Sequence, residues 1–341
     1  MRKFFHQKHQ KRPVASRSFV DYSCGGSPRS ATVFSLRWEK GASAEMGHDV
    51  VGIGHSTVDY LGLIERYPES DTKVEISEFS IQGGGPVATA LVTLAALGVD
   101  TAIVSKVSDD DFGRFIRSGL VEAGVDTTGL VVEPGKVSPF SFIAVERGSG
   151  KRTIFWTRGN LGRLEPEDVD LGLLEGAEVL HVDGIHSWAQ IAAARKAREL
   201  GVHVVYDAGS ARDGWKELVE LSDTVIASER FVSEAVPGAI AESLRSLARM
   251  GPGTVVITMG PEGSVGMEQG QTYIAPALDV EAVDTTGAGD VYHGAYIYAL
   301  LQGWTLQKRM RFASAAAGLK CRSLGGRAGI PTLGEILAAM D

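Results

Sequence analysis

The second half of the chain alternates two patterns in a regular order. After Leu164, apolar segments such as EVLHVDG, HVVYDAG and TVVITMG are separated by amphipathic segments such as AQIAAARKARELG. The first kind is typical of buried parallel strands, and the second of the helices that cover them. The alternation therefore predicts an α/β fold with a doubly wound, mostly parallel sheet and helices on both faces. In such sheets, ligands bind beyond the carboxyl ends of the strands.

Two segments in the first half do not fit inside that sheet. Residues from about 59–82 and 138–157 contain alternating apolar and polar positions, which is the pattern of half-exposed strands. We expect them to pair as a small separate β-sheet that forms a lid. Lys151 follows Gly148-Ser149-Gly150 between two of these strands, so we predict a hairpin turn there rather than a phosphate-binding P-loop.

The first 45 residues differ in character from the rest. Residues 1–45 are basic, and they show neither apolar periodicity nor the continuous hydrophobic stretch of a secretory signal. We interpret them as a disordered tail or as a start assigned too far upstream, with a transit peptide as the other alternative. Met46 lies just before the first buried strand. Residues 46–341 are expected to form one domain that buries a full core.

Charge and cysteine content exclude several classes of protein. The formal net charge of −8 gives no indication of a basic surface that would bind nucleic acid or anionic membranes. No apolar run reaches the length of about 18 residues that a membrane helix needs. Cys24 and Cys321 are too few and too far apart for a metal site or a disulfide framework. We therefore expect a soluble, cytoplasmic protein that binds neither nucleic acid nor membrane.

The sequence DTTGAGD, residues 284–290, carries the sharpest chemical signal. Its glycine-rich turn leads directly into a predicted helix whose first turn contains Asp290. Small residues let backbone N–H groups converge at a helix start, which makes an anion site. A carboxylate beside that site makes sense if the anion is a transferring phosphoryl group and Asp290 takes the proton of the acceptor hydroxyl. The alternative is a tight turn with Asp290 as a simple helix cap.

Two more glycine-rich turns follow predicted strands. The three glycines at 83–85 would let a ligand approach the backbone just before a helix that opens with Pro86. The segment 258–263 follows a buried strand, where a nucleotide-binding loop is one interpretation. For each of these two segments a plain turn explains the pattern equally well.

Together these segments resemble the ribokinase-like (PfkB) carbohydrate kinase family, from about Asp49 to Pro331. The GGG…AALG segment and DTTGAGD are similar to the family's two signatures, and they stand in the same order with TMGPEG between them. In finer detail, GGGP and GGRAGIP are similar to a bacterial subgroup that includes sulfofructose kinases. The resemblance implies the ribokinase-like fold, ATP and Mg²⁺ as cofactors, and phosphorylation of a sugar hydroxyl.

The resemblance also implies roles for individual positions. Asp290 would be the general base, and the backbone amides of residues 287–289 would form the anion hole. Asp59 would bind sugar hydroxyls, while Asp284 and carbonyls of the GGRAGIP loop would hold a potassium ion. The implied residues are Gly287, Ala288, Gly289 and Asp290 for catalysis, Asp59, Gly83, Gly84 and Gly85 for the substrate, and Ser228, Thr258, Gly260 and Gly263 for the nucleotide.

Several positions depart from the family pattern. Ala88 stands where relatives have a sugar-binding asparagine, and Gly184 where sulfofructose kinases have an arginine. Ser228 and Glu229 replace an Asn-x-x-Glu motif that relatives use near Mg²⁺, so Glu229 is the candidate metal contact. The substrate is therefore not assumed to be ribose or a sulfonated sugar.

Three further side chains are candidates near the predicted site. His186 and His293 would touch substrate or only pack in the core. Arg327, in the C-terminal glycine loop, would pair with a nucleotide phosphate, pair with an anionic substrate, or lie on the surface.

The predicted function is an ATP-dependent carbohydrate kinase with a small sugar or sugar-like substrate. A nucleoside kinase is the first alternative, because the lid segments are rich in aromatic residues. These are Phe140, Phe142, Phe155 and Trp156. A non-catalytic sugar sensor is the second alternative, although a sensor has no need of the base Asp290. The apolar alternate face of the lid strands predicts a homodimer joined through its lids.

Overall fold

A computed structural model describes residues 47–340, and the predicted tail at 1–45 lies outside the described residues. Its main sheet has the strand order β13-β12-β11-β10-β9-β8-β1-β4-β5. All neighbours from β11 to β5 are parallel, and β12 and β13 add an antiparallel edge. The strands are β1 (Val50–Ile53), β4 (Thr101–Val107), β5 (Leu130–Val132), β8 (Val179–Val182), β9 (His203–Ala208), β10 (Thr224–Ser228), β11 (Thr254–Thr258), β12 (Ser264–Glu268) and β13 (Gln271–Ala275). The predicted doubly wound, mostly parallel sheet is confirmed.

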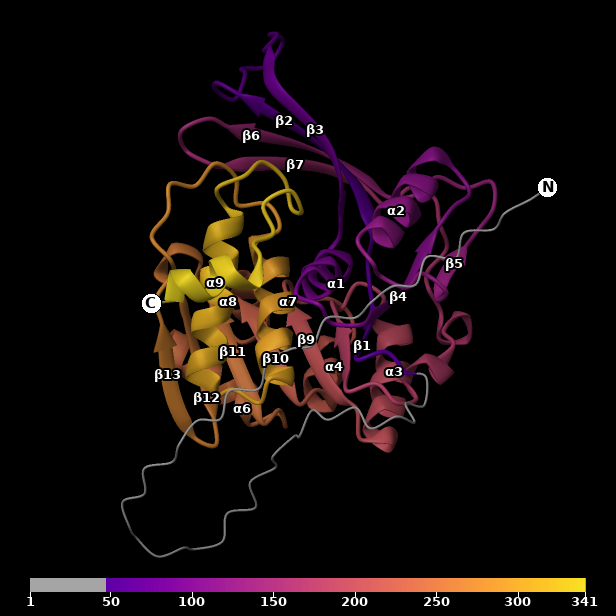
Figure 1. Ribbon diagram of the computed structural model, residues 1–341, viewed down its shortest axis with the longest axis vertical. Coiled ribbons are helices and arrows are strands. Elements are labelled where there is room, and N and C mark those ends of the chain that lie inside the picture. The colour runs from indigo at the N-terminus through magenta and orange to yellow at the C-terminus, as the bar shows by residue number, and fades with distance from the viewer. Residues whose placement is uncertain (1–46, 341) are drawn as a thin grey trace, which may run out of the picture. The chain divides into compact units, whose positions relative to one another are not determined.

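Helices cover both faces of this sheet, as Figure 1 shows. Neighbouring residues of β1 face different cores. Val50 belongs to the core that contains residues of α1, α2, α7, α8 and α9, whereas Val51 belongs to the core that contains residues of α3, α4, α5 and α6. Burial on both sides explains why the strands of this sheet contain apolar residues at consecutive positions instead of at alternate ones. The helices are α1 (Pro86–Ala96), α2 (Asp111–Glu122), α3 (Ser187–Leu200), α4 (Trp215–Leu221), α5 (Glu229–Ala235), α6 (Ile240–Ala248), α7 (Ala288–Leu301), α8 (Leu306–Lys320) and α9 (Leu333–Met340).

A separate four-stranded sheet, called the lid here, lies above these layers in the view of Figure 1. Its order is β3-β2-β6-β7, from β2 (Thr57–Ile64), β3 (Ile76–Gly84), β6 (Phe140–Glu146) and β7 (Arg152–Thr157). A second, smaller sheet was expected and is confirmed. Residues 65–75 join β2 to β3 outside the strands, so the first predicted lid segment contains two strands.

The two faces of the lid differ in chemistry, because paired residues on neighbouring strands share a face. Asp59 on β2 lies in register with Gln82, Ser141 and Trp156 on one face. Tyr60 lies in register with the apolar side chains of the opposite face, which are Ile81, Phe142 and Phe155. We call these the Asp59 face and the Tyr60 face. Leu61 and Ile143 of the Asp59 face pack against Leu324, in the loop after α8.

No helix among the described residues is long and apolar enough to cross a membrane.

Candidate active site

The start of α7 forms an anion-binding segment of the kind that DTTGAGD predicts. Gly287 precedes the helix with φ 73°, which only glycine adopts readily, and Gly326 leaves no room for a side chain there. Ala288 N–H donates to the carbonyl of Thr285 at 3.2 Å. No protein acceptor is within hydrogen-bond reach of the amides of Gly287 and Gly289 in residues 47–340. These two amides are free to bind an anion.

Asp284 anchors the beginning of the same segment. Its Oδ1 accepts hydrogen bonds from Thr286 N at 2.8 Å and from Thr286 Oγ1 at 2.7 Å. Its Oδ2 accepts from Gly325 N at 2.7 Å, and its backbone carbonyl accepts from Nζ of Lys320 at 2.9 Å. The carboxylate therefore joins the α7 start to the loop that follows α8.

Asp290 is half-buried in the first turn of α7. Burial and the nearby Asp207 together raise the pKa of Asp290 to about 7, although His293 lowers it. Asp207 is the second-last residue of β9, and burial together with Asp183 raises its pKa to about 8. Two carboxyl groups with raised pKa values thus lie at the carboxyl ends of the parallel strands.

His293 lies between these two carboxyl groups on α7. Its Nδ1 is 2.7 Å from the carbonyl oxygen of Gly289, and its Nε2 is 3.4 Å from Oδ1 of Asp207. Its ring stacks on His181 with centroids 5.8 Å apart. Burial lowers the pKa of His293, which favours the neutral ring. The contacts give His293 a packing and hydrogen-bonding role.

Asp59 lies beside the glycine segment that links the lid to α1. Ser141 Oγ donates to its Oδ1 at 2.5 Å, and a Cβ atom on Gly84 would stand 2.0 Å from its Oδ2. Burial raises the pKa of Asp59, although Ser141 and Arg327 lower it. Gly85 has φ 97° and lies against the carbonyl of His55. Glycine is therefore required at these positions by close approach and by backbone conformation.

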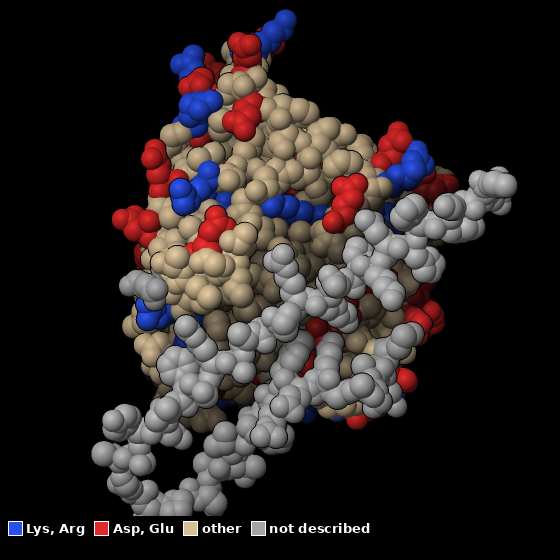
Figure 2. Space-filling model, viewed as in Figure 1, with Lys and Arg blue, Asp and Glu red and all other residues tan. Residues whose placement is uncertain are grey.

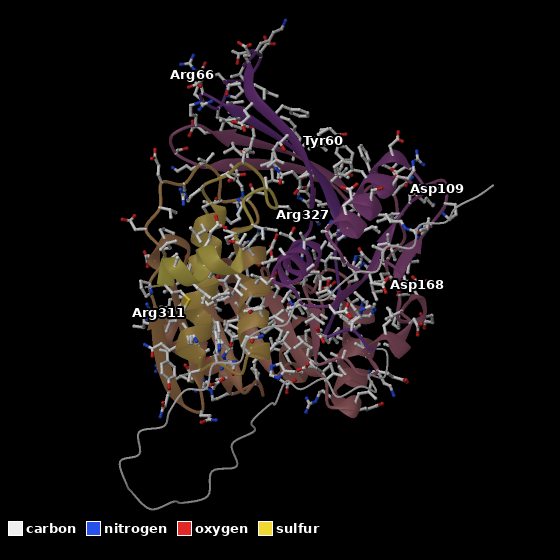
Figure 3. The ribbon with its side chains drawn as sticks, in the orientation of Figure 1. Tyr60, Arg66, Asp109, Asp168, Arg311 and Arg327 are labelled. Atoms are coloured by element: carbon white, nitrogen blue, oxygen red, sulfur yellow. The ribbon has the colours of Figure 1, made fainter. Side chains whose placement is uncertain are left out.

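Arg327 reaches across the edge of the lid from the loop after α8. Its Nη2 donates to the carbonyl of Gly84 at 3.1 Å and its Nε to Oγ1 of Thr89 at 3.4 Å. Gln82 accepts from the backbone N–H groups of Arg327 and Ala328, both at 3.1 Å, and donates to the carbonyl of Leu324 at 2.9 Å. Figure 3 shows Arg327 between the lid and the helices below it. Arg327 is thus bonded to the protein and is not a free surface cation.

A second group of polar side chains follows β1 and β8. Asp183 accepts from the backbone N–H of His55 at 2.7 Å and from Nε2 of Gln190 at 2.9 Å. The rings of His55 and His186 lie 6.2 Å apart. Burial lowers the pKa of His55 to about 4 and also lowers the pKa of His186. Gly184, at φ 73°, leaves no space for a larger side chain, because Tyr206 Oη would lie 2.8 Å from its Cβ.

The predicted nucleotide residues come together in part. Ser228 and Thr258 are register partners at the ends of β10 and β11, and Gly260 follows them with φ 54°. Ser228 Oγ caps α5 by accepting from Phe231 N at 3.0 Å. Gly263 packs tightly, because a Cβ there would lie 2.2 Å from the carbonyl of Ala275.

Glu229 is the candidate metal contact, and Ala88 stands where relatives have a sugar-binding asparagine. Glu229 is exposed at the start of α5, whereas Ala88 is buried within α1. Within residues 47–340 there is no group of three or more His, Cys, Asp or Glu side chains that could hold a metal ion by themselves.

Several residues of this site were not predicted from the sequence. Asp183 and Asp207 had a detectable signal, since Asp183 directly follows β8 and Asp207 is the second-last residue of β9. Gln82, Ser141, Arg152 and Lys320 had none, because each acts on a segment far away in the sequence. Arg152 of β7, for example, donates to Oγ1 of Thr285.

A lid over the carboxyl ends of a parallel sheet, an amide-lined helix start and a half-buried carboxylate define a phosphotransferase that acts on small molecules. The chain belongs to the pfkB family of carbohydrate kinases, whose family model matches residues 48–333. It is an ATP-dependent kinase that phosphorylates a sugar or sugar derivative.

Named relatives cover most of the chain. A nucleoside kinase of Methanothermobacter thermautotrophicus is 27% identical over 292 residues, which are 84% of this chain and 94% of that protein. A 5-dehydro-2-deoxygluconokinase of Shouchella clausii is 28% identical, over 86% of this chain and 95% of that protein. A solved ribokinase of Arabidopsis thaliana, in complex with ribose and ATP, has a TM-score of 0.74 at 22% identity and covers 87% of this chain and 99% of that chain. The finer resemblance to sulfofructose kinases stays a prediction.

Proposed function

We propose that the substrate hydroxyl is bound between Asp59 and Asp290 and that Asp290 is the general base of phosphoryl transfer. The observation that carries this assignment is the position of Asp290, half-buried beside the free amides of Gly287 and Gly289. A base works best when its pKa is near the working pH, and the pKa of Asp290 is raised to about 7. The amides would stabilise the charge on the transferred group.

Mg²⁺ fits the donors present in the described part of the chain. It is usually held by one or two carboxylates together with waters and substrate phosphates, so a cage of three protein ligands is not needed. Asp207 lies near Asp290, so these two carboxyl groups would be the candidates to hold the ion. When bound, the ion supplies positive charge to the phosphates of ATP. Exposed Glu229 remains a second candidate contact.

The nucleotide is proposed to lie over the ends of β10 and β11. Ser228 and Thr258 place hydroxyl groups there, and Gly260 leaves the backbone open. Gly263 would then act by shaping the turn rather than by touching the nucleotide.

The lid offers one aromatic side chain to the substrate. Trp156 is 60% exposed and shares the Asp59 face, in register with Ser141. Phe140, Phe142 and Phe155 belong to the other face of the sheet, so they give no support to a nucleoside substrate. Trp156 would stack on a sugar ring or on a base, which keeps a nucleoside as the second candidate. A phosphorylation screen of sugars, phosphosugars and nucleosides with ATP and Mg²⁺ separates the two.

The test of the catalytic assignment is Asp290→Asn. We expect kcat to fall by at least about a hundredfold while ATP binding is kept, since a general base contributes on that scale. Asp111→Asn is the matched control, because Asp111 is an exposed first-turn aspartate of α2. Near-normal turnover of Asp290→Asn would refute the role, and binding of sugar without turnover by the unmodified protein would favour the sensor alternative.

We also propose that two copies of the chain associate through the Tyr60 faces of their lids. Phe79, Ile81 and Phe155 on this face are 54%, 41% and 53% exposed. Figure 2 shows a broad area almost without charged side chains where Figure 1 places the lid. Apolar surface of this kind is typical of a protein interface. A second copy presents the same chemistry and fits the surface by symmetry.

Two further proposals concern the extent of the domain and the location of the protein in the cell. Residues 46–341 would form one kinase domain under its lid. A cytoplasmic location is supported by Cys321, which is buried and makes no disulfide within residues 47–340.

A further inference from the structure

Lys320, the last residue of α8, is buried directly behind the anion-binding segment. Its exposed fraction is 0%, and its Nζ donates to the carbonyl of Asp284 at 2.9 Å. Figure 1 shows α7 and α8 side by side. A lysine is almost never buried completely without a compensating partner. Its ammonium group is therefore held in one position, at the backbone carbonyl of Asp284 where the anion-binding segment begins.

The potassium ion implied by the family resemblance does not fit Asp284. Both carboxylate oxygens already accept hydrogen bonds, from Thr286 N, from Thr286 Oγ1 and from Gly325 N. The backbone carbonyl of Asp284 accepts from the ammonium group of Lys320. An ion at this residue would share a carboxylate that already accepts three hydrogen bonds, and it would stand near the like charge of Lys320.

We propose that Lys320 is the built-in cation of this site and that the enzyme needs no monovalent metal ion. The ammonium carries the same single charge as potassium and holds the carbonyl of Asp284, six residues before the base. The segment is thereby fixed with the amides of Gly287 and Gly289 facing the transferred group. The inference rests on the proposed anion hole, and Lys320 is a positioning residue because it does not touch the substrate.

Acidic groups around Lys320 partly offset the effect of its burial. Burial lowers the pKa of Lys320, whereas Asp284, Cys321 and Asp290 raise it and Arg152 lowers it. The acidic neighbours thus favour the charged form that burial opposes.

The first test uses the unmodified enzyme. Its kinase rate and its melting temperature are measured in tetramethylammonium, sodium and potassium chloride at equal ionic strength. We expect no difference between the three salts. A rate several-fold higher in potassium, or a melting temperature raised by potassium alone, would overturn the proposal. The melting series needs no turnover, so it decides the inference even if the proposed catalytic role fails.

The second test is Lys320→Met, which keeps the length of the side chain and removes the charge. In tetramethylammonium we expect kcat to fall at least about tenfold with little change in KM for the sugar, which is less than the roughly hundredfold or greater loss for a direct anion-hole donor because Lys320 acts only by positioning. Potassium should then restore part of the rate and raise the melting temperature of this variant. The control is Lys196→Met, which removes a surface lysine paired with Glu199.

Two outcomes of the Lys320→Met experiment would count against the proposal. Full activity of Lys320→Met without potassium would contradict the proposal, as would an equal loss in every salt. If the variant does not fold, the salt series on the unmodified enzyme still decides.

Discussion

Asp290 and Asp207 form a coupled pair of carboxyl groups at the reaction centre. Nδ1 of His293 is 2.7 Å from the carbonyl oxygen of Gly289, and Nε2 is 3.4 Å both from the carbonyl oxygen of Ile226 and from Oδ1 of Asp207. Burial and Asp183 raise the pKa of Asp207 to about 8, which favours its protonated form at pH 7. One carboxyl group then stays neutral at pH 7 while its neighbour, Asp290, is free to act as a base.

This arrangement predicts a specific pH dependence. Activity should rise with pH as Asp290 loses its proton, with an apparent pKa near 7 in kcat/KM. Asp207→Asn cannot ionise, so it removes the contribution of Asp207 to the raised pKa of Asp290. The pKa of Asp290 should therefore fall, and the rising limb should move to lower pH. A pH–rate profile of both proteins measures the shift.

The same substitution has a consequence for stability. The pKa of Asp207 is raised in the folded protein, so folding stability declines as pH rises from about 4 toward 8. Asp207→Asn cannot ionise and should escape this decline, so its melting temperature relative to the parent should increase over that range. An unchanged rate profile together with an unchanged melting difference would contradict the coupling.

Residues could be predicted from the sequence where the signal is local. Asp290 and Gly287 stand in one short motif, and their positions at the start of α7 follow from it. Lys320 and Gln82 could not be predicted, because each is defined by a partner in another segment. Lys320 contacts Asp284, and Gln82 contacts Leu324.

At the scale of elements, periodicity identified the strands but not their neighbours. Continuous apolar runs predicted β8, β9 and β11, and alternation predicted β6 and β7. Alternation does not reveal that β2 pairs in parallel with β6, since this pairing joins residues 82 positions apart. It also did not identify β12 and β13 as an antiparallel edge.

The loop after α8 is joined to the edge strand β3 by a group of hydrogen bonds, which we call the clasp. Gln82 supplies three hydrogen bonds of this clasp, and Arg327 adds one to the carbonyl of Gly84. The same loop touches Gly287 through Gly326 and Asp284 through Gly325. The clasp therefore connects the lid to the anion-binding segment.

Gln82→Leu should loosen this connection. Three hydrogen bonds are lost at about 0.5–1.5 kcal/mol each, so we expect a lower melting temperature and a higher KM for the sugar. Gln302→Leu is the matched control, since Gln302 is exposed at the end of α7. Calorimetry and steady-state kinetics measure the two effects. A variant with unchanged stability and KM would show that the clasp does not hold the lid.

At the scale of the whole molecule, the Tyr60 face of the lid decides the state of association. Phe79→Glu places a charge in the middle of the proposed interface and should convert a dimer into monomers. Ile274→Glu is the control, because Ile274 is 71% exposed on β13 of the main sheet. Light scattering after size exclusion gives the mass. A parent protein that is already monomeric, or a Phe79→Glu dimer, would refute the interface.

The clasp also has a consequence for how the enzyme is made. Every strand of both sheets lies before residue 276, whereas the loop that fastens the lid begins only after α8. A growing chain can thus complete both sheets before the hydrogen bonds between β3 and the loop after α8 can form. The ability to transfer phosphate is acquired in the last steps of synthesis, after the scaffold has formed.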